Sequence, residues 1–401
     1  MNFLFVHEVN WREKVTFEIH DIPELLSIAG HSVTFIDYPE VSIDKKSKNF
    51  RPFRTTFSRI QSRTHNGSTV EVRTPGRILP GTADRLVASL TFVPLLIKTI
   101  RSKKIDLIVL YGVPTNGWQT VLVAKLLRVP VIFRAIDVSH LLRGSLYKNL
   151  IRTAERFIYK NVDHISVHNA ALGEYCSSFG ANSKNISINY PRLDTKRFAR
   201  FARDQDLASK YGITEKNKVV FYRGTLYRFS GLEQFLELFA ETLRNDQNIF
   251  VLIIGSGEAK KDIAETIDRL GVQNQVLLRP FVEYSELVKH ICLADVSVNT
   301  FVPSLVTDCA LPGRVLQSLA CGIPVVSTPL KGLISYTGDS KSVVYAPLGV
   351  EFVQAVNDLL LNKSERDLLS VAGRELVASK GDWQQFTAEF VELCQSVLAR
   401  K

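Results

Sequence analysis

The sequence predicts an α/β protein made of two doubly wound domains, each built on a mostly parallel sheet. Short apolar strands alternate with amphipathic helices along most of the chain. The first strand, residues 2–6, is followed by a helix at 16–29, a Gly30-His31 stop and a strand at 32–37, which is how a parallel α/β domain opens. A chain of 401 residues is also long for a single core, so we expect two domains.

The same pattern continues through the first domain, which we expect to span residues 1–200. The predicted strands are 105–110, 131–133, 164–168 and 186–188, and the predicted helices are 88–102, 118–127, 146–161 and 171–179. Residues 45–85 are basic and aromatic without clean periodicity, so no element is predicted there. The chain is expected to leave this domain at the turn formed by residues 189–194.

The second domain is expected to span residues 201–380 and to repeat the alternation. Its predicted strands are 219–222, 249–254, 275–278, 296–299 and 323–326, and its predicted helices are 232–243, 259–270, 284–294, 314–320, 351–361 and 365–379. A last helix is predicted at 383–400, within the tail 381–401.

The loop after the strand at 131–133 carries two candidate catalytic residues, Asp137 and His140. It lies at the carboxyl end of a strand, where binding groups gather in open α/β sheets. For Asp137 the alternative is an N-cap of the following helix. A histidine near a cleft can shuttle protons, although most histidines have structural roles.

The composition indicates in which cellular compartment the protein is expected. The longest apolar runs are strand-sized and too short to span a bilayer, and Glu8 interrupts the apolar start that an export signal would need. The five cysteines are scattered and lack the spacing of a metal site, so we expect buried thiols in a reducing compartment. These features predict a globular protein of the cytoplasm.

The basic charge is concentrated in one segment. Residues 51–160 hold 19 basic and 5 acidic side chains, and the whole chain carries a net charge of +10. This excess favours a polyanionic partner, such as an anionic membrane surface, over generic solubility. The helix at 146–161 has Lys148, Arg152, Arg156 and Lys160 on one face, although a plain solvated face is the commoner meaning of such spacing. No nucleic-acid-binding module accompanies the basic residues, so nucleic acid is not the expected partner.

A second candidate site lies at residues 308–332. Asp308 and Pro312 suit a turn or a helix start, Arg314 lies in the first turn of the helix, and Gly322 ends it before a buried strand. Backbone N–H groups at a helix start, together with a guanidinium group, form an anion-binding site. The alternative is an ordinary helix-to-strand corner of an α/β domain.

The same stretch resembles the nucleotide-sugar-binding segment of family 4 of the glycosyltransferases, which have the GT-B fold. The matching residues are Pro312-x-Arg314-x-x-Gln317 and Ala320-x-Gly322-x-Pro324-Val325-Val326. In that family the basic residue lies near the donor diphosphate, and a Glu in the place of Gln317 binds the ribose hydroxyls. The resemblance therefore implies two Rossmann-like domains facing a cleft, with the last helix returning to the first domain.

A second match is the loop with Gly224, Arg228 and Gly231, which follows the strand at 219–222. Glycines allow the backbone to approach phosphate closely, and either Arg223 or Arg228 faces the diphosphate in this reading. Ser304 and Asp308 stand where the family has donor-sugar contacts, and Asp137 stands where it has a residue facing the transferred sugar. The full set of candidate donor-binding residues is Gly224, Arg228, Arg314, Gln317, Asp308 and Ser304.

The resemblance implies a retaining hexosyltransferase that uses a UDP- or GDP-type nucleotide-diphosphate sugar and acts on a lipid-linked or polysaccharide acceptor. It implies no cofactor and no catalytic metal, because basic residues and helix termini neutralise the leaving diphosphate. The alternative is a catalytically impaired GT-B protein that only binds its ligand, because Gln317 replaces the family Glu. The expected place of action is the cytoplasm, with peripheral binding to the inner membrane face as a further hypothesis.

Overall fold

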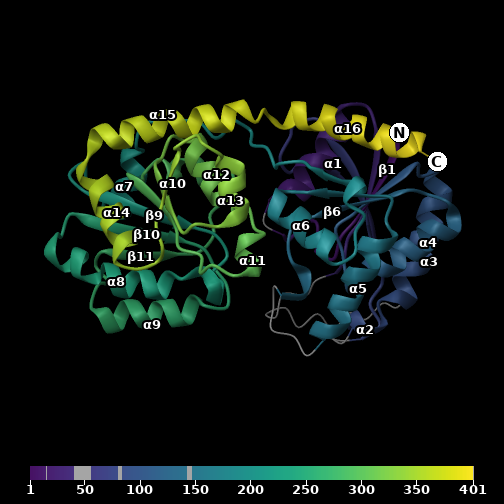
Figure 1. Ribbon diagram of the computed structural model, residues 1–401, viewed down its shortest axis with the longest axis horizontal. Coiled ribbons are helices and arrows are strands. Elements are labelled where there is room, and N and C mark those ends of the chain that lie inside the picture. Colours follow the sequence, from purple (N-terminus) through teal and green to yellow (C-terminus); the bar gives the residue numbers. More distant parts are fainter. Residues whose placement is uncertain (15, 40–55, 80–83, 142–146, 401) are drawn as a thin grey trace. The chain divides into compact units, whose positions relative to one another are not determined.

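The structure is a computed structural model that describes the chain except residues 15, 40–55, 80–83, 142–146 and 401 (Figure 1). The chain divides into two compact units. The first contains Met1–Pro191 and Trp383–Lys401, and the second contains Arg192–Asp382. The division falls within the turn 189–194, and the last helix belongs to the first unit.

The first unit is built on an eight-stranded sheet with the order β3-β4-β2-β1-β5-β6-β7-β8. All neighbouring strands are parallel except β3 and β4, which are antiparallel. The order reverses between β1 and β5, which makes the sheet doubly wound. The strands are β1 (Asn2–Val6), β2 (Ser32–Ile36), β3 (Thr56–Gln61), β4 (Thr69–Thr74), β5 (Leu107–Leu110), β6 (Val131–Ala135), β7 (His164–Val167) and β8 (Ile186–Ile188).

Helices cover both faces of this sheet. Alternate residues of the central strands, such as Phe3, Phe5 and Val109, join one apolar core with residues of α1 and α16. On the remaining side, α3 contacts α4 and α4 contacts α5. The helices are α1 (Glu18–Ile28), α2 (Asp84–Val87), α3 (Ser89–Lys103), α4 (Gly117–Leu127), α5 (Lys148–Asn161), α6 (Ala170–Ser178) and α16 (Trp383–Ala399).

The second unit is built on a six-stranded parallel sheet with the order β11-β10-β9-β12-β13-β14. Its order reverses between β9 and β12, so this sheet is doubly wound as well. The strands are β9 (Lys218–Arg223), β10 (Ile249–Ile254), β11 (Val276–Arg279), β12 (Val296–Asn299), β13 (Val325–Ser327) and β14 (Val343–Tyr345).

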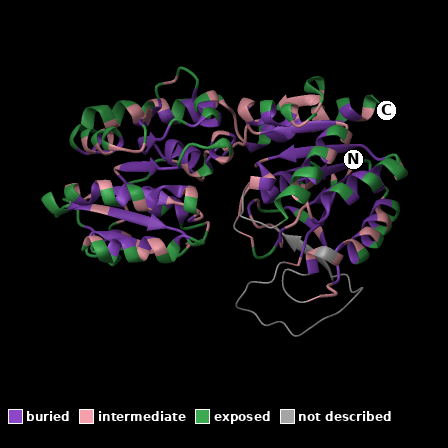
Figure 2. Cartoon of the chain, turned by 60° about the horizontal axis from the view of Figure 1, so that its bottom comes forward, coloured by how far each residue is buried: buried purple, intermediate pink, exposed green. Residues whose placement is uncertain are grey.

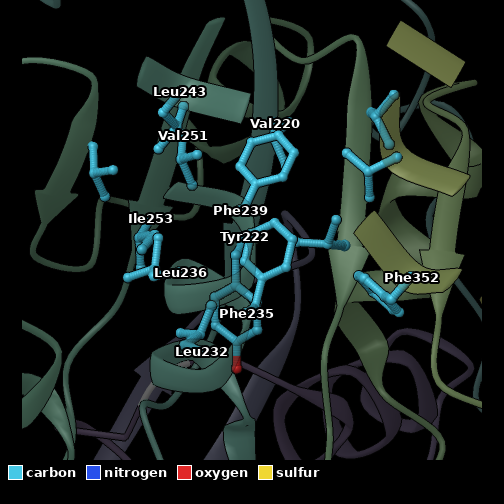
Figure 3. Close-up of a cluster of buried hydrophobic side chains, with 14 of the residues drawn as sticks. Val220, Tyr222, Leu232, Phe235, Leu236, Phe239, Leu243, Val251, Ile253 and Phe352 are labelled. Carbon is cyan, nitrogen blue, oxygen red and sulfur yellow. The ribbon is translucent and has the colours of Figure 1, made fainter. Parts of the chain in front are cut away.

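The core of the second unit lies between this sheet and its helices. Figure 3 shows Tyr222 of β9 beside Phe235 and Phe239 of α8, and all three side chains are buried. In Figure 2 the strands of both sheets are mostly buried, while the helices present exposed outer faces. The helices of the second unit are α7 (Gln205–Lys210), α8 (Leu232–Asn245), α9 (Lys260–Leu270), α10 (Leu287–Ile291), α11 (Leu305–Asp308), α12 (Gly313–Ala320), α13 (Lys331–Thr337), α14 (Val350–Leu361) and α15 (Lys363–Ser379).

The predicted fold class, two doubly wound α/β domains, is confirmed, but several elements differ from the prediction. The part of 45–85 that the structure describes contains β3 and β4, so the expectation of no element there was wrong. In β4 the buried Val70 and Val72 flank the half-buried Glu71, an alternation that basic neighbours obscured in the sequence. The helix predicted at 284–294 is reduced to the five residues of α10, and α7, α11, α13 and β14 were not predicted.

Two predictions from composition can be compared with the structure. None of the described helices combines the length and the apolar character needed to cross a membrane. All five cysteines are buried as free thiols, as the scattered spacing predicted.

Candidate functional site

The donor-side candidates gather where the order of the second sheet reverses. The loop after β9 begins at Gly224, and the loop after β12 begins at Thr300 and leads through α11 to α12. Because β9 and β12 are parallel neighbours, their carboxyl ends meet at one edge of the sheet. Ligands of open α/β sheets bind at such a reversal of strand order. The fold therefore brings two motifs about 90 residues apart in the sequence to one place.

Arg314 is held by this arrangement. Its guanidinium carbon lies 4.4 Å from the ring centroid of Tyr222 and 4.4 Å from that of Phe301, so the group is stacked between two aromatic rings. It also lies against the backbone of Gly224, where an added Cβ would be only 2.7 Å from Nη2 of Arg314. Gly224 has φ +145°, a conformation that side chains disfavour. Gly224 is thus required both by its backbone and by the position of Arg314.

A second guanidinium lies beside the first. Nη1 of Arg223 donates a hydrogen bond of 2.8 Å to Oε1 of Gln317 on α12. Burial, followed by the neighbouring charge of Arg314, lowers the pKa of Arg223 to about 10. The group therefore remains protonated at neutral pH. No carboxylate forms an ion pair with either Arg223 or Arg314 within the described part of the chain, so two positive charges are left for an anionic ligand.

The start of α12 adds backbone donors next to Arg314. The first turn of a helix leaves backbone N–H groups without intrahelical partners, and the N-cap residue Pro312 has no side chain that could accept from them. Gly313 is exposed, with no atom within 4 Å of an added Cβ, so the helix end is open. A helix start with free N–H groups and two guanidinium groups has the chemistry of a diphosphate site.

Three further glycines hold the loop after β9 in place. A Cβ on Gly255 would lie 2.0 Å from the carbonyl oxygen of Gly224, and one on Gly257 would lie 2.4 Å from that of Leu226. A Cβ on Gly231, the N-cap of α8, would lie 2.1 Å from the carbonyl oxygen of Thr300. Close backbone packing around this loop therefore explains the glycines at these positions.

The remaining donor-side candidates have other partners in the structure. Arg228 is exposed at the start of a 3-10 turn (Arg228–Ser230), so of the two arginines it is Arg223 that lies beside Arg314. Ser304 is the N-cap of α11, with its hydroxyl accepting from the backbone N–H of Thr307. Asp308 accepts a hydrogen bond of 3.3 Å from the backbone N–H of Lys331. Ligand contacts of Arg228, Ser304 and Asp308 remain predictions.

In the first unit, a buried ion pair lies next to the loop after β6 that carries the candidates Asp137 and His140, which we call the acceptor-side loop. Nε and Nη2 of Arg134 each lie 3.0 Å from a carboxylate oxygen of Glu18, and Nε2 of His168 lies 2.8 Å from Oε2 of Glu18. Nη1 of Arg134 also donates to Ser166 and to the backbone carbonyl of Asn189. Arg134 thus ties α1 to the carboxyl ends of β6, β7 and β8.

Asp137 lies close to this network but does not pair with Arg134. Its side chain is half-buried, and within the described residues no hydrogen bond to its carboxylate is found. Loss of hydration on burial raises the pKa of Asp137, while the charge of His168 acts in the opposite direction. Asp137 does not cap a helix there. A partly dehydrated carboxylate with acceptor oxygens unused by the described residues has the properties of a functional group.

His140 is held in a different environment. Its Nδ1 lies 2.6 Å from Oε2 of Glu155, and the hydroxyl of Tyr175 donates to the same carboxylate oxygen at 3.0 Å. The side chains of His140 and Glu155 are buried, and Glu155 also accepts from the backbone N–H of Ser139. This arrangement fixes the loop after β6 onto α5, which is a structural role. A catalytic role for His140 stays a prediction without structural support.

Sequence reasoning missed Glu18, His168 and His7 as neighbours of the acceptor-side site. His7 follows β1 and stacks on Tyr111 after β5, with ring centroids 5.3 Å apart, at the point where the order of the first sheet reverses. Loss of hydration lowers the pKa of His7 to about 3, so its ring is neutral. Their positions at strand ends and in the first turn of α1 were the only signal available in the sequence.

A metal site is not evident in the part of the chain that the structure describes, where no three His, Cys, Asp or Glu side chains come together. The positive charge at the candidate site comes from Arg223, Arg314 and the start of α12. Whether the protein works without a metal or cofactor remains a prediction.

Family models match both units. The model described as glycosyl transferases group 1 matches residues 204–376, and the model of the glycosyl transferase 4-like domain matches residues 26–191. The first match contains the Gly224 loop and α12. The second match contains Asp137, and it also contains Arg134 and His168, which contact Glu18.

Curated relatives are distant and match over part of their length. An uncharacterized glycosyltransferase of Methanocaldococcus jannaschii is 18% identical over 62% of this chain and 62% of its own length. A D-inositol 3-phosphate glycosyltransferase of Segniliparus rotundus is 29% identical over 52% of this chain and 46% of its own. An alpha-D-kanosaminyltransferase of Streptomyces kanamyceticus is 24% identical over 45% of this chain and 45% of its own. The match thus spans about half the length of these relatives.

Solved structures share the fold over nearly the whole chain. The Anabaena protein HepE in complex with UDP and glucose superposes with a TM-score of 0.74 at 15% identity, covering 99% of this chain and 100% of that one. Sucrose-phosphate synthase of Thermosynechococcus elongatus gives a TM-score of 0.77 at 14% identity, covering 100% of both chains. At such low identity these structures establish the GT-B fold alone.

Proposed function

Because both units match glycosyl transferase models and together form a GT-B fold, the chain is a glycosyltransferase resembling family 4, and we propose that it transfers a sugar from a nucleotide-diphosphate sugar to an acceptor hydroxyl. The proposed donor is of the UDP or GDP type and the proposed sugar is a hexose. The single observation that carries this proposal is the pair Arg223 and Arg314, which lie beside the open start of α12 without a carboxylate partner in the described structure.

The proposed role of these groups is to stabilise the leaving diphosphate. Arg314 is fixed between Tyr222 and Phe301 before any ligand arrives, so its charge needs no reorganisation when negative charge develops on the diphosphate. The free N–H groups of the α12 start bind phosphate oxygens, and Gly224 lets the backbone come close to them. This arrangement supplies positive charge from the protein's own residues.

We further propose a retaining reaction, in which the acceptor hydroxyl attacks the anomeric carbon on the face that the nucleotide leaves. Asp137 is the proposed polar partner of the transferred sugar, since its partly dehydrated carboxylate has acceptor oxygens left free by the described residues. We assign a positioning role to the network of Arg134, Glu18 and His168. Its hydrogen bonds hold the end of β6, from which the loop carrying Asp137 begins.

The proposed acceptor is a lipid-linked or polysaccharide molecule, and the proposed place is the cytoplasm, peripherally on the inner membrane face. The charge of residues 51–160, with 19 basic and 5 acidic side chains, supports a partner that is anionic. A role in polysaccharide biosynthesis for the cell envelope would follow from such an acceptor.

A second candidate function is a GT-B protein that binds its ligand without catalysis. The observation that favours it is Gln317, whose neutral amide stands where the family has a carboxylate and already accepts from Arg223. An amide can still bond a ribose diol through its NH2 group, although the bond is weaker than one to a carboxylate. Release of nucleotide from a sugar donor distinguishes the two functions, because a pure binding protein produces none.

The proposal is tested by thermal stabilisation with UDP, GDP, ADP and their sugars, on the native chain and on Arg314→Ala. We expect one nucleotide to raise the melting temperature and Arg314→Ala to weaken its binding about 10- to 100-fold, the loss typical of a charge-assisted contact. A nucleotide present at about 100 times a micromolar Kd would raise the melting temperature measurably. If none of the nucleotides does so, the proposed donor site is overturned. Stabilisation without nucleotide release from any donor would favour the binding-protein alternative.

A further inference from the structure

One face of the first unit carries an excess of basic charge. Helices α3, α4 and α5 lie side by side, with Gln119 of α4 bonded to Ser89 of α3 and Lys125 of α4 bonded to Asn161 of α5. Among the residues of these three helices the sole carboxylate is that of Glu155, which is buried against His140. Their exposed charged side chains are all basic: Lys98, Arg101, Lys125, Lys148, Arg152, Arg156 and Lys160.

The same outer face also exposes large apolar side chains. Leu126 is 78% exposed, Leu150 is 62% exposed and Leu90 is 60% exposed, and Trp118 and Leu122 are exposed beside Leu126 on α4. Single exposed leucines are ordinary, but several on adjacent helices mark an interaction surface. We name the exposed residues of α3, α4 and α5 the basic apolar face; Figure 1 labels these three helices.

The long helices α9 and α15 of the second unit lack this charge pattern. On α9 the residues Lys260, Lys261 and Arg269 are accompanied by Asp262, Glu265 and Asp268. On α15 an exposed ion pair joins Lys363 to Asp367. A row of exposed basic residues without exposed acidic partners is therefore not a feature of every long helix of this protein.

We propose that the basic apolar face binds the surface of an anionic lipid bilayer, with its lysines and arginines at the headgroups and the exposed leucines and Trp118 in the interfacial layer. Basic side chains near an anionic membrane are attracted to it, and exposed apolar side chains gain by leaving water at the headgroup boundary. Trp in particular is enriched at the membrane interface. The two kinds of residue together match a bilayer in chemistry.

The mixture of side chains also argues against a nucleic acid as the occupant. Single-stranded nucleic acids need aromatic platforms on which bases stack, and duplexes need phosphate contacts along a groove. The face exposes a single tryptophan, Trp118, whereas its other large apolar side chains, Leu90, Leu122, Leu126 and Leu150, are aliphatic and provide neither. A bilayer accepts both the charges and the leucines.

This inference deepens the proposed function, because it assigns the surface that would bring the enzyme to a lipid-linked acceptor. The test measures lipid binding and not sugar transfer. The membrane-binding inference can therefore fail while the proposed donor site is upheld, and the donor site can fail while membrane binding is upheld. The full chain is sedimented with vesicles of phosphatidylcholine alone and with vesicles containing about one third phosphatidylglycerol, at about 0.1 M and at high salt.

Two variants remove one component of the face at a time. Lys148→Glu with Arg156→Glu reverses two exposed charges on α5, and Leu122→Ser with Leu126→Ser removes two exposed apolar side chains on α4. None of these four side chains makes a hydrogen bond or ion pair within the described residues, so folding should be retained, which a thermal melt checks.

Control variants make changes of the same kind on the second unit, although Lys261 there forms an exposed ion pair with Glu265. Lys260→Glu with Lys261→Glu alters exposed charges on α9, and Leu361→Ser with Leu368→Ser alters leucines that are 76% and 73% exposed. These controls account for the effect of net charge and of exposed apolar area alone.

We expect the native chain to sediment with the anionic vesicles at low salt and not with phosphatidylcholine alone. Because each basic residue near the surface contributes about fivefold, the charge variant should lose about 100-fold or more in partition constant, and the leucine variant about tenfold or more. The controls should bind like the native chain. Absence of lipid-dependent sedimentation, or an equal loss in the controls, would overturn the inference. So would tight binding to single-stranded DNA that only the charge variant weakens.

Discussion

Nη1 of Arg223 donates a hydrogen bond of 2.8 Å to Oε1 of Gln317, joining the end of β9 to the middle of α12 across 94 residues of sequence. Because the acceptor is a neutral amide, the charge of Arg223 is not cancelled and adds to that of Arg314. The NH2 group of Gln317 is left as a donor. A glutamate at this position would instead form an ion pair with Arg223.

Gln317→Leu should lower the stability of the second unit. The substitution leaves the guanidinium of Arg223 largely buried without its acceptor, and an unsatisfied buried donor costs about 1–3 kcal/mol. Urea unfolding measures the loss. Gln317→Glu supplies a carboxylate for the same hydrogen bond and should unfold at or above the native urea midpoint. Equal midpoints for Leu and Gln at position 317 would contradict the importance of this bond.

Gly224→Ala should weaken nucleotide binding by displacing Arg314. Its Cβ would lie 2.7 Å from Nη2 of Arg314, and φ +145° is unfavourable for alanine. We expect about a tenfold or greater rise in the Kd of the nucleotide that stabilises the native chain, measured by calorimetry. Gly271→Ala is the control, since Gly271 has φ +69° with no atom near an added Cβ. An equal effect of both changes would mean that backbone strain, not Arg314, is responsible.

Asp137→Asn should reduce activity without reducing stability. The pKa of Asp137 is raised by burial, so the folded protein holds this proton more tightly than the unfolded chain, and stability falls as pH rises above the ordinary value of 3.8. The neutral asparagine lacks this penalty and should be at least as stable as the native chain at pH 7, with the difference vanishing at low pH. We expect nucleotide release to fall about 100-fold or more.

His140→Phe provides the comparison for that experiment. The change leaves the buried carboxylate of Glu155 without its imidazole partner, although Tyr175 still donates to it. The free energy of unfolding should fall by roughly 2 kcal/mol or more. A variant that keeps native stability but loses activity would instead give His140 the catalytic role that its buried position argues against.

Glu18→Gln should destabilise the first unit in a pH-dependent way. Burial would raise the pKa of Glu18, but Arg134 and His168 outweigh it and hold the pKa well below 4.5. A depressed carboxyl pKa contributes stability that is present above pH 4.5 and lost as pH falls further. We expect Glu18→Gln to cost about 3–5 kcal/mol at pH 7, because Arg134 stays buried without its carboxylate.

Denaturant unfolding of the native chain and of Glu18→Gln across a pH series checks this prediction. The difference between the two proteins should shrink as pH falls below 4.5, because the unfolded native chain then binds a proton at Glu18 while the folded chain keeps this carboxylate ionised. A difference that is constant with pH would mean that the shape of the side chain, and not its charge, stabilises the network.

Local sequence patterns determined most of the fold. Apolar runs of four to six residues, such as 249–254, can be buried on both faces only in a covered parallel sheet, which is why the strands were predictable. The Gly30-His31 stop and Gly322 marked helix ends because glycine tolerates the left-handed conformation, and both glycines have positive φ. The spacing of Pro312, Arg314 and Gln317 likewise placed the candidate anion site at the start of α12.

Only the tertiary structure decided which side chains meet there. Arg314 is stacked between Tyr222 and Phe301, and Arg223, not Arg228, lies next to it, because β9 and β12 pair side by side in the sheet. The same holds for His140. The sequence suggested a residue near a cleft, but in the structure His140 is buried, with Nδ1 at 2.6 Å from Glu155, which also accepts from Tyr175. Such contacts depend on strand order and helix packing over tens of residues, whereas periodicity and spacing describe what a chain does within a few turns.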